Sequence, residues 1–483
     1  MRQIGGLDVT VLEVLDGANN SLDIAERPDF LDLAGRQELD LDADRLCDAR
    51  VIMVLVHPVA RAREANVRYL AKAAWIVVAT LALPFSAIAQ GEAIKDVPKY
   101  AGALTFAPDG TLFVGDNISS AVFAYKTVQA QPEQVDPKAP PLEIDSVDNR
   151  IAPIVRSKIG QVEINGMAVH PISREIYLSV SRKGNGGVEP AIVKISLTGK
   201  ISEFKLNAPD RSEFKIKDAP TPNQHFADRA GQWPVPSPEK YHEKAKTSMR
   251  SMTIVDMKFH AGELYIAGIS NEEFASTLRR VPYPFTDAIS ETKIKIYHDA
   301  HAQWETRAPI RAMTFAQIDG KDTLIAAYTC SPIALIPIDD LKNGAQIEGR
   351  VIGDMGNGQP LSMFNFNYNS EASLFVTNAA HDPRIIPIAS LQHARVITEA
   401  DSNHHLKMDT TELPAGVVGK AVMFVGSSLH ADLLNDRFII SLTRNANSGN
   451  LNLESLPTYP LPIRLDEIWA EYDFQGAQPL KNN

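Results

Sequence analysis

A short strand–turn–strand unit recurs along most of this chain, and it limits the possible folds more than any other feature. In its clearest copy, two strand-like stretches flank the turn Pro108-Asp109-Gly110. Proline sets φ for the first turn position and glycine takes a positive φ, so this sequence favours a β-hairpin. Six copies are recognisable, and they cover residues 103–116, 166–180, 256–268, 313–327, 363–377 and 421–441.

The spacing of the copies predicts a β-propeller. Successive copies begin roughly 50 to 90 residues apart, which leaves room for four strands and their loops in each repeat. Apolar segments such as 191–195 and 334–338 follow at the place of a third strand. We expect an all-β fold, a six- or seven-bladed propeller, in which 96–100 and 463–474 would supply a seventh blade. A β-sandwich, or two smaller β domains, is the alternative.

Residues 67–89 have the features of an export signal. Arg68 and Lys72 form a basic start, residues 73–85 form an apolar core, and the last three residues, Ala-Ile-Ala, match the pattern that signal peptidases cleave. The core is too short to cross a bilayer of roughly 30 Å, so the segment favours a signal peptide over a membrane anchor. We therefore expect a periplasmic or secreted protein.

The residues ahead of this signal do not resemble a targeting segment. Residues 1–60 contain twelve acidic side chains against five arginines, whereas the start of a signal peptide is short and basic. We interpret 1–66 as a start-site extension or a disordered lead, with translation beginning near Val67 or Met53. A true cytosolic lead segment is the alternative.

The remaining residues, 90–483, are expected to form one propeller domain with a long inserted loop at 207–250. This loop is rich in proline and charge, and loops of such length in a compact domain are often functional. The chain has a formal net charge of −11 and no basic stripe, which argues against nucleic-acid binding. No apolar run of membrane-spanning length follows the signal, so we expect no membrane span in the mature chain.

Two segments carry a resemblance to known families. The turn at 107–114 resembles the blade turns of secreted propellers of the NHL, YVTN and SMP-30/gluconolactonase-like groups. The segment 164–171 is similar to a strand of the last group, in which the matching asparagine ligates a divalent metal on the propeller axis. The resemblance therefore implies Asn165 as a metal ligand, with Glu163 beside it. The residues by themselves favour a hydrogen-bonding asparagine at a strand end.

A polar segment before the fourth copy is the most distinctive motif of the chain. It runs from His298 to Arg311 and ends in the letters ETRAPIR, and the strand after it ends in YTCSP. This combination resembles a segment of uncharacterised exported bacterial propellers, which implies a fold and a location but no activity. Because inner strands of a propeller run along its channel, we expect Glu305, Arg307 and Arg311 to share one opening of that channel.

Arginine suits bidentate contacts to carboxylate or phosphate, so this opening could bind an anionic ligand. A structural network of glutamate and arginine is the alternative. Cys330 is the one thiol after the signal, and we expect it to be buried, because no base for a catalytic thiol is evident. The candidate ligand-binding residues are Glu305, Arg307, Arg311, Tyr328, Cys330 and Trp304.

His298 and His301 are candidate metal ligands in the same segment. Their i, i+3 spacing would let them face one ion on a helix, but an extended segment would point them apart. Further ligands for zinc or copper would come from other repeats, and a solvated loop histidine is the alternative at each position. The histidines available are His381, His404, His405 and His430.

These observations leave more than one function open. No nucleophile elbow or phosphate-binding loop is present after the signal, which favours a scaffold that binds a small molecule or another periplasmic protein. The alternative is a metal-dependent, lactonase-like hydrolase with a divalent metal on the propeller axis. A third hypothesis is electron transfer with a quinone or copper partner. A divalent metal is the one cofactor that the sequence suggests.

The export signal makes a direct prediction about the mature protein. When the chain is expressed in a Gram-negative host, cleavage after Ala89 should release a product whose first residue is Gln90. Amino-terminal sequencing of the exported protein measures this directly. A mature protein that still begins within 1–66 would contradict both the signal peptide and the start-site interpretation.

Overall fold

The computed structural model places the chain in two units, Met1–Ala89 and Gln90–Asn483, and each is described by itself. In the first unit it describes five short strands: β1 (Gln3–Ile4) pairs with β2 (Leu7–Asp8), and β3 (Glu13–Leu15) pairs with β4 (Ser21–Leu22) and β5 (Val51–Met53). In the second unit it describes residues 96–127, 141–184, 187–225, 248–299, 302–329, 332–355, 358–401, 416–417, 419–422, 427–445 and 447–459.

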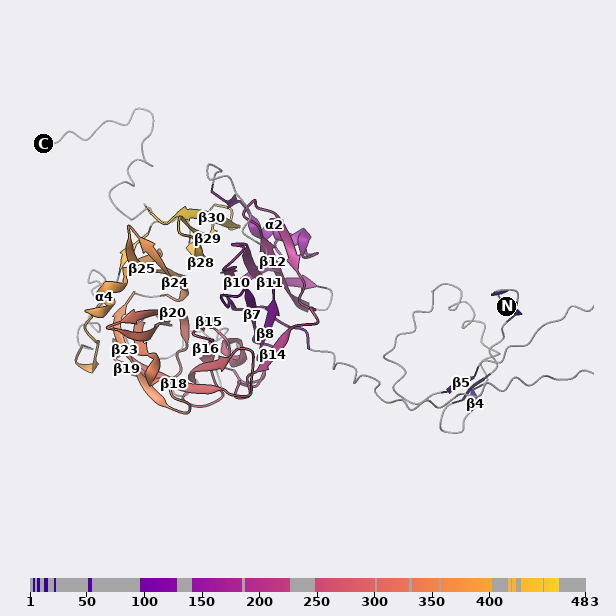
Figure 1. The fold of residues 1–483 in the computed structure, drawn as a ribbon, viewed down its shortest axis with the longest axis horizontal. Coiled ribbons are helices and arrows are strands. Elements are labelled where there is room, and N and C mark those ends of the chain that lie inside the picture. Colours follow the sequence, from indigo (N-terminus) through magenta and orange to yellow (C-terminus); the bar gives the residue numbers. More distant parts are fainter. Residues whose placement is uncertain are drawn as a thin grey trace, which may run out of the picture. The chain divides into compact units, whose positions relative to one another are not determined.

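The second unit consists of β-sheets arranged around a central axis (Figure 1). Two four-stranded sheets come first in the chain, and each is named here after its innermost strand. The β6 array contains β6 (Leu104–Phe106), β7 (Thr111–Asp116), β8 (Ala121–Lys126) and β14 (Ser212–Lys215). The β10 array contains β10 (Val162–Val169), β11 (Ile176–Gly184), β12 (Gly187–Ile195) and β13 (Ile201–Phe204).

A nine-stranded sheet follows and joins two such arrays through their outermost strands. The β15 array contains β15 (Asp256–His260), β16 (Glu263–Ile269), β17 (Ser276–Pro282) and β18 (Ser290–His298), with β19 (Gln303–Glu305) paired to β18. The β20 array contains β20 (Ile310–Ile318), β21 (Lys321–Tyr328), β22 (Pro332–Pro337) and β23 (Gln346–Asp354). Strands β18 and β23 are parallel, and all other pairs in this sheet are antiparallel.

Two more four-stranded sheets complete the described part of the unit. The β24 array contains β24 (Pro360–Tyr368), β25 (Glu371–Asn378), β26 (Arg384–Pro387) and β27 (Lys420–Ala421). The β28 array contains β28 (Ser427–Asn435), β29 (Phe438–Arg444), β30 (Leu451–Pro457) and β9 (Glu143–Ile144). The described helices are short: α2 (Val147–Ile154), α4 (Ile388–Gln392), η4 (Met249–Met252), η6 (Ile338–Asp340) and η7 (Glu399–Asp401).

The hydrophobic core lies between neighbouring arrays. Alternate residues of a strand point to opposite faces of its sheet, so one strand serves two interfaces. In β7, Leu112 and Val114 pack toward the β10 array, while Phe113 packs toward the β15 array. The same arrangement repeats at six interfaces: β6 with β10, β10 with β28, β28 with β24, β24 with β20, β20 with β15, and β15 with β6.

The order of the arrays around the axis differs from their order in the chain. The β6 array comes first in sequence but packs between the β10 and β15 arrays. Two outermost strands are supplied by distant segments: β9 completes the β28 array, and β14 completes the β6 array after the β10 array has formed. Strand β9, which precedes the β10 array in the chain, therefore pairs with β30, the last described strand. This pairing joins an early and a late part of the unit.

The structure confirms the all-β, propeller-like arrangement and corrects two of the boundaries expected from sequence. Residues 421–424 were expected to begin the innermost strand of the sixth copy, but that strand is β28, and Lys420–Ala421 is the outermost strand of the preceding array. Val422 is apolar because it packs in the core between the two arrays. Segment 207–250 is not wholly loop, since β14 lies within it and packs Phe214 on the core.

Residues 226–247 and 463–474 lie outside the described part of the chain. Residues 96–100, expected to share a seventh blade with 463–474, form no strand. Among the described residues, no helix is both long enough and apolar enough to cross a membrane.

A buried ion pair fixes the segment after β14 to the β15 array. Arg279 on β17 is fully buried and contacts Asp218 through two hydrogen bonds, of 3.0 Å from Nε and 2.6 Å from Nη2. It also donates to the carbonyl oxygens of Thr253 and Ile269. One side chain therefore holds three segments together.

Replacing this arginine should destabilise the protein strongly. The Arg279→Met variant leaves the Asp218 carboxylate without its guanidinium partner, and we expect the free energy of unfolding to fall by about 3 kcal/mol. Lys215→Met is the matched control, because the Lys215–Asp96 pair involves the same segment but is exposed at both ends. Urea denaturation followed by circular dichroism compares the two; similar effects in both variants would contradict this role of Arg279.

Candidate functional site

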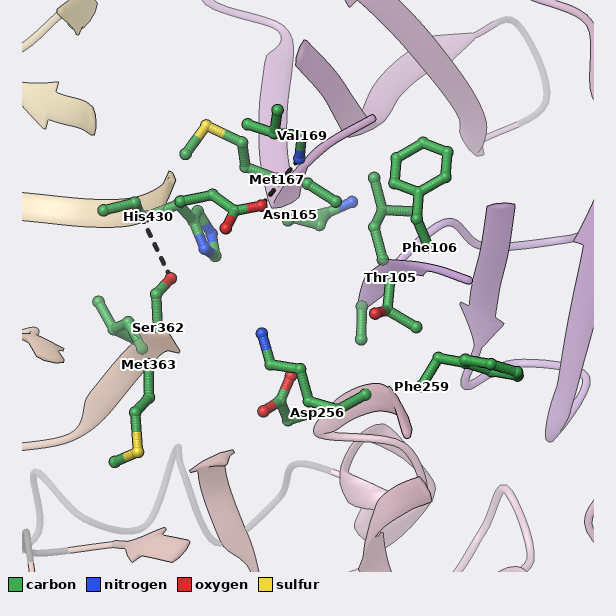
Figure 2. A pocket seen from close by; sticks show the side chains of 18 of the residues that line it. Thr105, Phe106, Asn165, Met167, Val169, Asp256, Phe259, Ser362, Met363 and His430 are labelled. Carbon is green, nitrogen blue, oxygen red and sulfur yellow. Dashed lines mark hydrogen bonds between the residues drawn. The ribbon is translucent and has the colours of Figure 1, made fainter. Parts of the chain in front are cut away.

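A cavity of about 270 Å³ lies on the axis of the ring. It is lined by residues from five innermost strands, β6, β10, β15, β24 and β28, or from the residues next to them. Figure 2 shows side chains from these strands facing a common space, among them Asn165, Asp256 and His430. The cavity therefore corresponds to the central channel expected of a propeller.

Two aspartates in the cavity wall bind backbone groups of neighbouring arrays. Asp256 at the start of β15 accepts hydrogen bonds from the backbone N–H groups of Met257 (2.8 Å) and Met313 (2.9 Å). Asp432 on β28 accepts from Leu433 and Val169, both at 2.8 Å. In each case one donor is the next residue and the other belongs to the adjacent innermost strand.

Burial raises the pKa of Asp256 and of Asp432 above the usual value, and the positive charge of Lys258 opposes this effect in both. Both carboxylates accept hydrogen bonds from backbone N–H groups, and one of the two donors belongs to a neighbouring array. Their main structural role is therefore to connect neighbouring arrays around the channel.

Lys258 and His430 give the cavity its remaining polar character. Lys258 lies on the same face of β15 as Asp256, because the two residues are separated by one position. Among the described residues, none forms a hydrogen bond or ion pair with the Lys258 ammonium group. Burial lowers the pKa of His430 to about 4, so its imidazole is neutral near pH 7 and can both donate and accept.

Asn165 also lines the cavity, and its amide connects two arrays. The Nδ2 group donates to the carbonyl oxygen of Ala101 and to Ser181 Oγ, both at 2.8 Å. This is the hydrogen-bonding role that the residues by themselves suggested. Glu163, which the resemblance placed beside a metal ligand, is exposed on the same strand.

A second polar cluster lies at the ends of the two parallel outermost strands. His298, the last residue of β18, is 1% exposed and contacts Glu305 through Nδ1 (2.9 Å) and Asp354 through Nε2 (3.4 Å). His298, Asp299 and Asp354 each place one possible ligand atom within 4.8 Å of the others. Burial by itself lowers the pKa of His298, but hydrogen bonds to Asp354 and Glu305 outweigh it and raise the pKa to about 9.

The structure gives the three charged residues of the ETRAPIR motif different partners. Glu305 lies on β19, beside an outermost strand, and binds His298. Arg307 forms an ion pair with Glu273. Arg311 is on the innermost strand β20, where burial lowers its pKa and its Nη1 contacts Met252 Sδ at 3.6 Å. The chain enters this motif from the outer edge of a sheet, which is why its first residues do not line the channel.

The other candidates of this region are also dispersed. Trp304 is 36% exposed, donates from Nε1 to Glu399 Oε1 (2.6 Å) and lies under Lys295 Nζ at 4.4 Å. Tyr328 is fully buried at the end of β21, and burial raises its pKa. Four candidates, His301, Cys330, His404 and His405, lie outside the described residues, and His381 is exposed.

Sequence reasoning missed several of the polar residues at these two sites, among them Asp256, Lys258, Asp432 and Asp299. A usable signal existed for the first two, because a strand that begins with Asp-x-Lys places two charges on one face. Asp354 was missed as well, since its closeness to His298 depends on the parallel pairing of β18 with β23.

No protein-family model matches the chain, and no curated protein matches it. Solved structures with a similar arrangement include the β-propeller domain of Swd1 from Myceliophteria thermophila (TM-score 0.33, 9% identity, covering 77% of this chain and 87% of that one). A hydrazine synthase from Kuenenia stuttgartiensis has a TM-score of 0.24 at 12% identity, covering 76% and 98%.

The aldose sugar dehydrogenase from Streptomyces coelicolor, in its PQQ-bound form, has a TM-score of 0.30 at 11% identity, covering 75% and 96%. Similarity at this level transfers no activity, ligand or cofactor to this chain.

The neutral state of His430 predicts a pH dependence of stability. Its folded-state pKa of about 4 lies below the ordinary value of 6.5, so the unfolded chain takes up the proton first as the pH falls. His430 should therefore lower the free energy of unfolding as the pH falls from 6.5 to 4. His430→Gln should lose this component, whereas the exposed His393→Gln should keep it.

Urea denaturation at several pH values between 4 and 7 measures the effect. The difference in the free energy of unfolding between wild type and His430→Gln separates this group from the aspartates of the channel, whose pKa values are raised by burial. A difference that is constant over this range would contradict the buried, neutral state of His430.

Proposed function

We propose that this protein is an exported, six-bladed propeller that binds a small molecule in its central cavity. The ligand carries acceptor oxygens, such as those of a carboxylate or hydroxy acid. Six blades are supported by the six inter-array cores, which already form a closed cycle within the described residues. The likeness to the NHL, YVTN and SMP-30-like groups and the export signal are part of the same proposal.

The ammonium group of Lys258 carries this proposal. It lies on the wall of the axial cavity, and no described residue forms a hydrogen bond or ion pair with it. A lysine offers three donors, and an ammonium in such a place favours a ligand that brings acceptors. The neighbouring carboxylates of Asp256 and Asp432 are held by backbone N–H groups, so the ligand need not displace an ion pair.

His430 adds selectivity to this cavity. Its neutral imidazole can donate to an oxygen of the ligand and accept from a hydroxyl group. Apolar residues such as Leu361 and Pro171 also line the cavity and can pack on a short carbon chain. A small hydroxylated molecule with at most one carboxylate would match this combination of one cation, two carboxylates held by backbone donors, one neutral polar group and apolar surface.

The metal-dependent hydrolase has weaker support. Within the described residues, the group of three His or carboxylate ligands lies at the ends of β18 and β23, not on the innermost strands. A metal on the axis is therefore not the function that the cavity favours.

The ligand proposal can be tested with a panel of short carboxylates, hydroxy acids and sugars in a thermal-shift assay. A ligand at about 100 times its Kd should stabilise the wild type by about 2.7 kcal/mol. Lys258→Met should abolish the response. Lys321→Met, at an exposed position at the start of β21, is the matched control and should retain it. A compound that stabilises both variants equally binds elsewhere, and a panel without any response contradicts the proposed ligand class.

A further inference from the structure

The cluster at the ends of β18 and β23 has the composition of a metal site. It combines one imidazole with carboxylates that come from three segments: Asp299 follows β18, Glu305 lies on β19 and Asp354 ends β23. His298, Asp299 and Asp354 are all buried. Imidazole and carboxylate groups that meet in one buried site are the donors that ions of the zinc class use.

The spacing of the groups fits direct coordination. Two ligands at about 2.1 Å from a tetrahedral zinc ion are separated by roughly 3.4 Å. His298 Nε2 and Asp354 Oδ2 are 3.4 Å apart, and all three candidate ligand atoms lie within 4.8 Å of one another.

Glu305 has the position of an orienting carboxylate. It contacts Nδ1 of His298 at 2.9 Å, on the opposite side of the ring from Asp354. A histidine ligand commonly donates its second ring N–H to a carboxylate, which fixes the tautomer and turns the free nitrogen toward the ion. Nε2, which faces Asp354, is the nitrogen that would bind a metal, and the ion would displace the Nε2 proton on binding.

We propose that His298, Asp299 and Asp354 bind a divalent transition-metal ion of the zinc class, with Glu305 orienting His298. The imidazole favours such ions over Ca²⁺ or Mg²⁺, which prefer oxygen ligands. Three protein ligands leave at least one coordination position for water or another group. The proposal is independent of the ligand cavity, whose Lys258 belongs to an innermost strand.

The site would also strengthen the junction between two arrays. Strands β18 and β23 hold the β15 and β20 arrays in one sheet by parallel pairing from Lys293↔Gln346 to Ile296↔Gly349. A metal that joins the ends of both strands binds only the folded chain, so it should raise the stability of the protein.

The test uses untagged, full-length exported protein that has been treated with a chelator and then dialysed. Titration with Co²⁺ should give visible absorption bands that saturate at about one equivalent, and Zn²⁺ should displace them. Asp354→Asn should remove this binding. Glu305→Gln retains all three ligands but should weaken binding about 10- to 100-fold, the usual effect of losing an orienting carboxylate.

Asp322→Asn is the matched control. Asp322 also contacts a histidine, His260, at 2.7 Å, but this pair is partly exposed and, among the residues that the structure describes, belongs to no group of three candidate ligands. The control should bind Co²⁺ like the wild type. Circular dichroism and gel filtration establish that each variant is folded; if Asp354→Asn is not, Glu305→Gln decides the outcome.

Two results would overturn the proposal. The first is folded wild-type protein that gives no saturable Co²⁺ or Zn²⁺ binding at the cluster. The second is unchanged affinity in a folded Asp354→Asn or Glu305→Gln variant, which would place any bound metal elsewhere. Neither result bears on the Lys258-dependent ligand response, so the two proposals fail separately.

Discussion

The strands of this ring are buried on both faces, and the rest of the structure depends on that double burial. In β7 and β21, consecutive residues alternate between two different inter-array cores: Leu324 and Ala326 face one, and Ile325 and Ala327 face the other. No array can bury its apolar surface alone, because each face needs a neighbour. The fold is therefore stable only when the cycle of interfaces is closed.

The ring closes because two arrays receive their outermost strands from distant segments of the chain, not from the segment that follows directly. The chain leaves the β6 array, contributes β9 to the β28 array, builds the β10 array, and returns with β14 to the outer edge of the β6 array. Helix α2, between β9 and β10, fills the core between the β10 and β28 arrays with Val147 and Ile151. The interface that joins the beginning of the ring to its end thus contains segments from both.

Short-range signals were enough to predict the fold class but not the path of the chain. Turns such as Pro108-Asp109-Gly110 and the period-2 strands revealed the hairpins of the innermost strands, because both depend on neighbouring residues. The outer strands β9 and β14 are two and four residues long and pair with partners far away in the sequence. Nothing in their local pattern specifies those partners.

The candidate sites could likewise be predicted only in part, because they depend on contacts between residues far apart in the sequence. The sequence placed His298 and Glu305 in one polar segment, and the two side chains are in contact. The candidate metal site also needs Asp354, which comes close to His298 only because two outermost strands pair in parallel. The channel residues were harder to predict. Asp256 and Lys258 look like ordinary strand residues until β15 is known to be an innermost strand.

Most polar groups around the axis are used by the fold itself. Asp256, Asp432, Asn165 and Asn365 each bind a backbone group of a neighbouring array, so these junctions combine an apolar core with a polar link at its inner edge. Because these side chains are held by backbone partners, they help to specify the geometry of the ring at little cost. Lys258 differs from these groups: within the described residues its ammonium group has no hydrogen bond or ion pair, and its charge acts on Asp256 and Asp432 only through space. A ligand with acceptor oxygens could therefore bind this ammonium group without displacing a bond that the described fold makes.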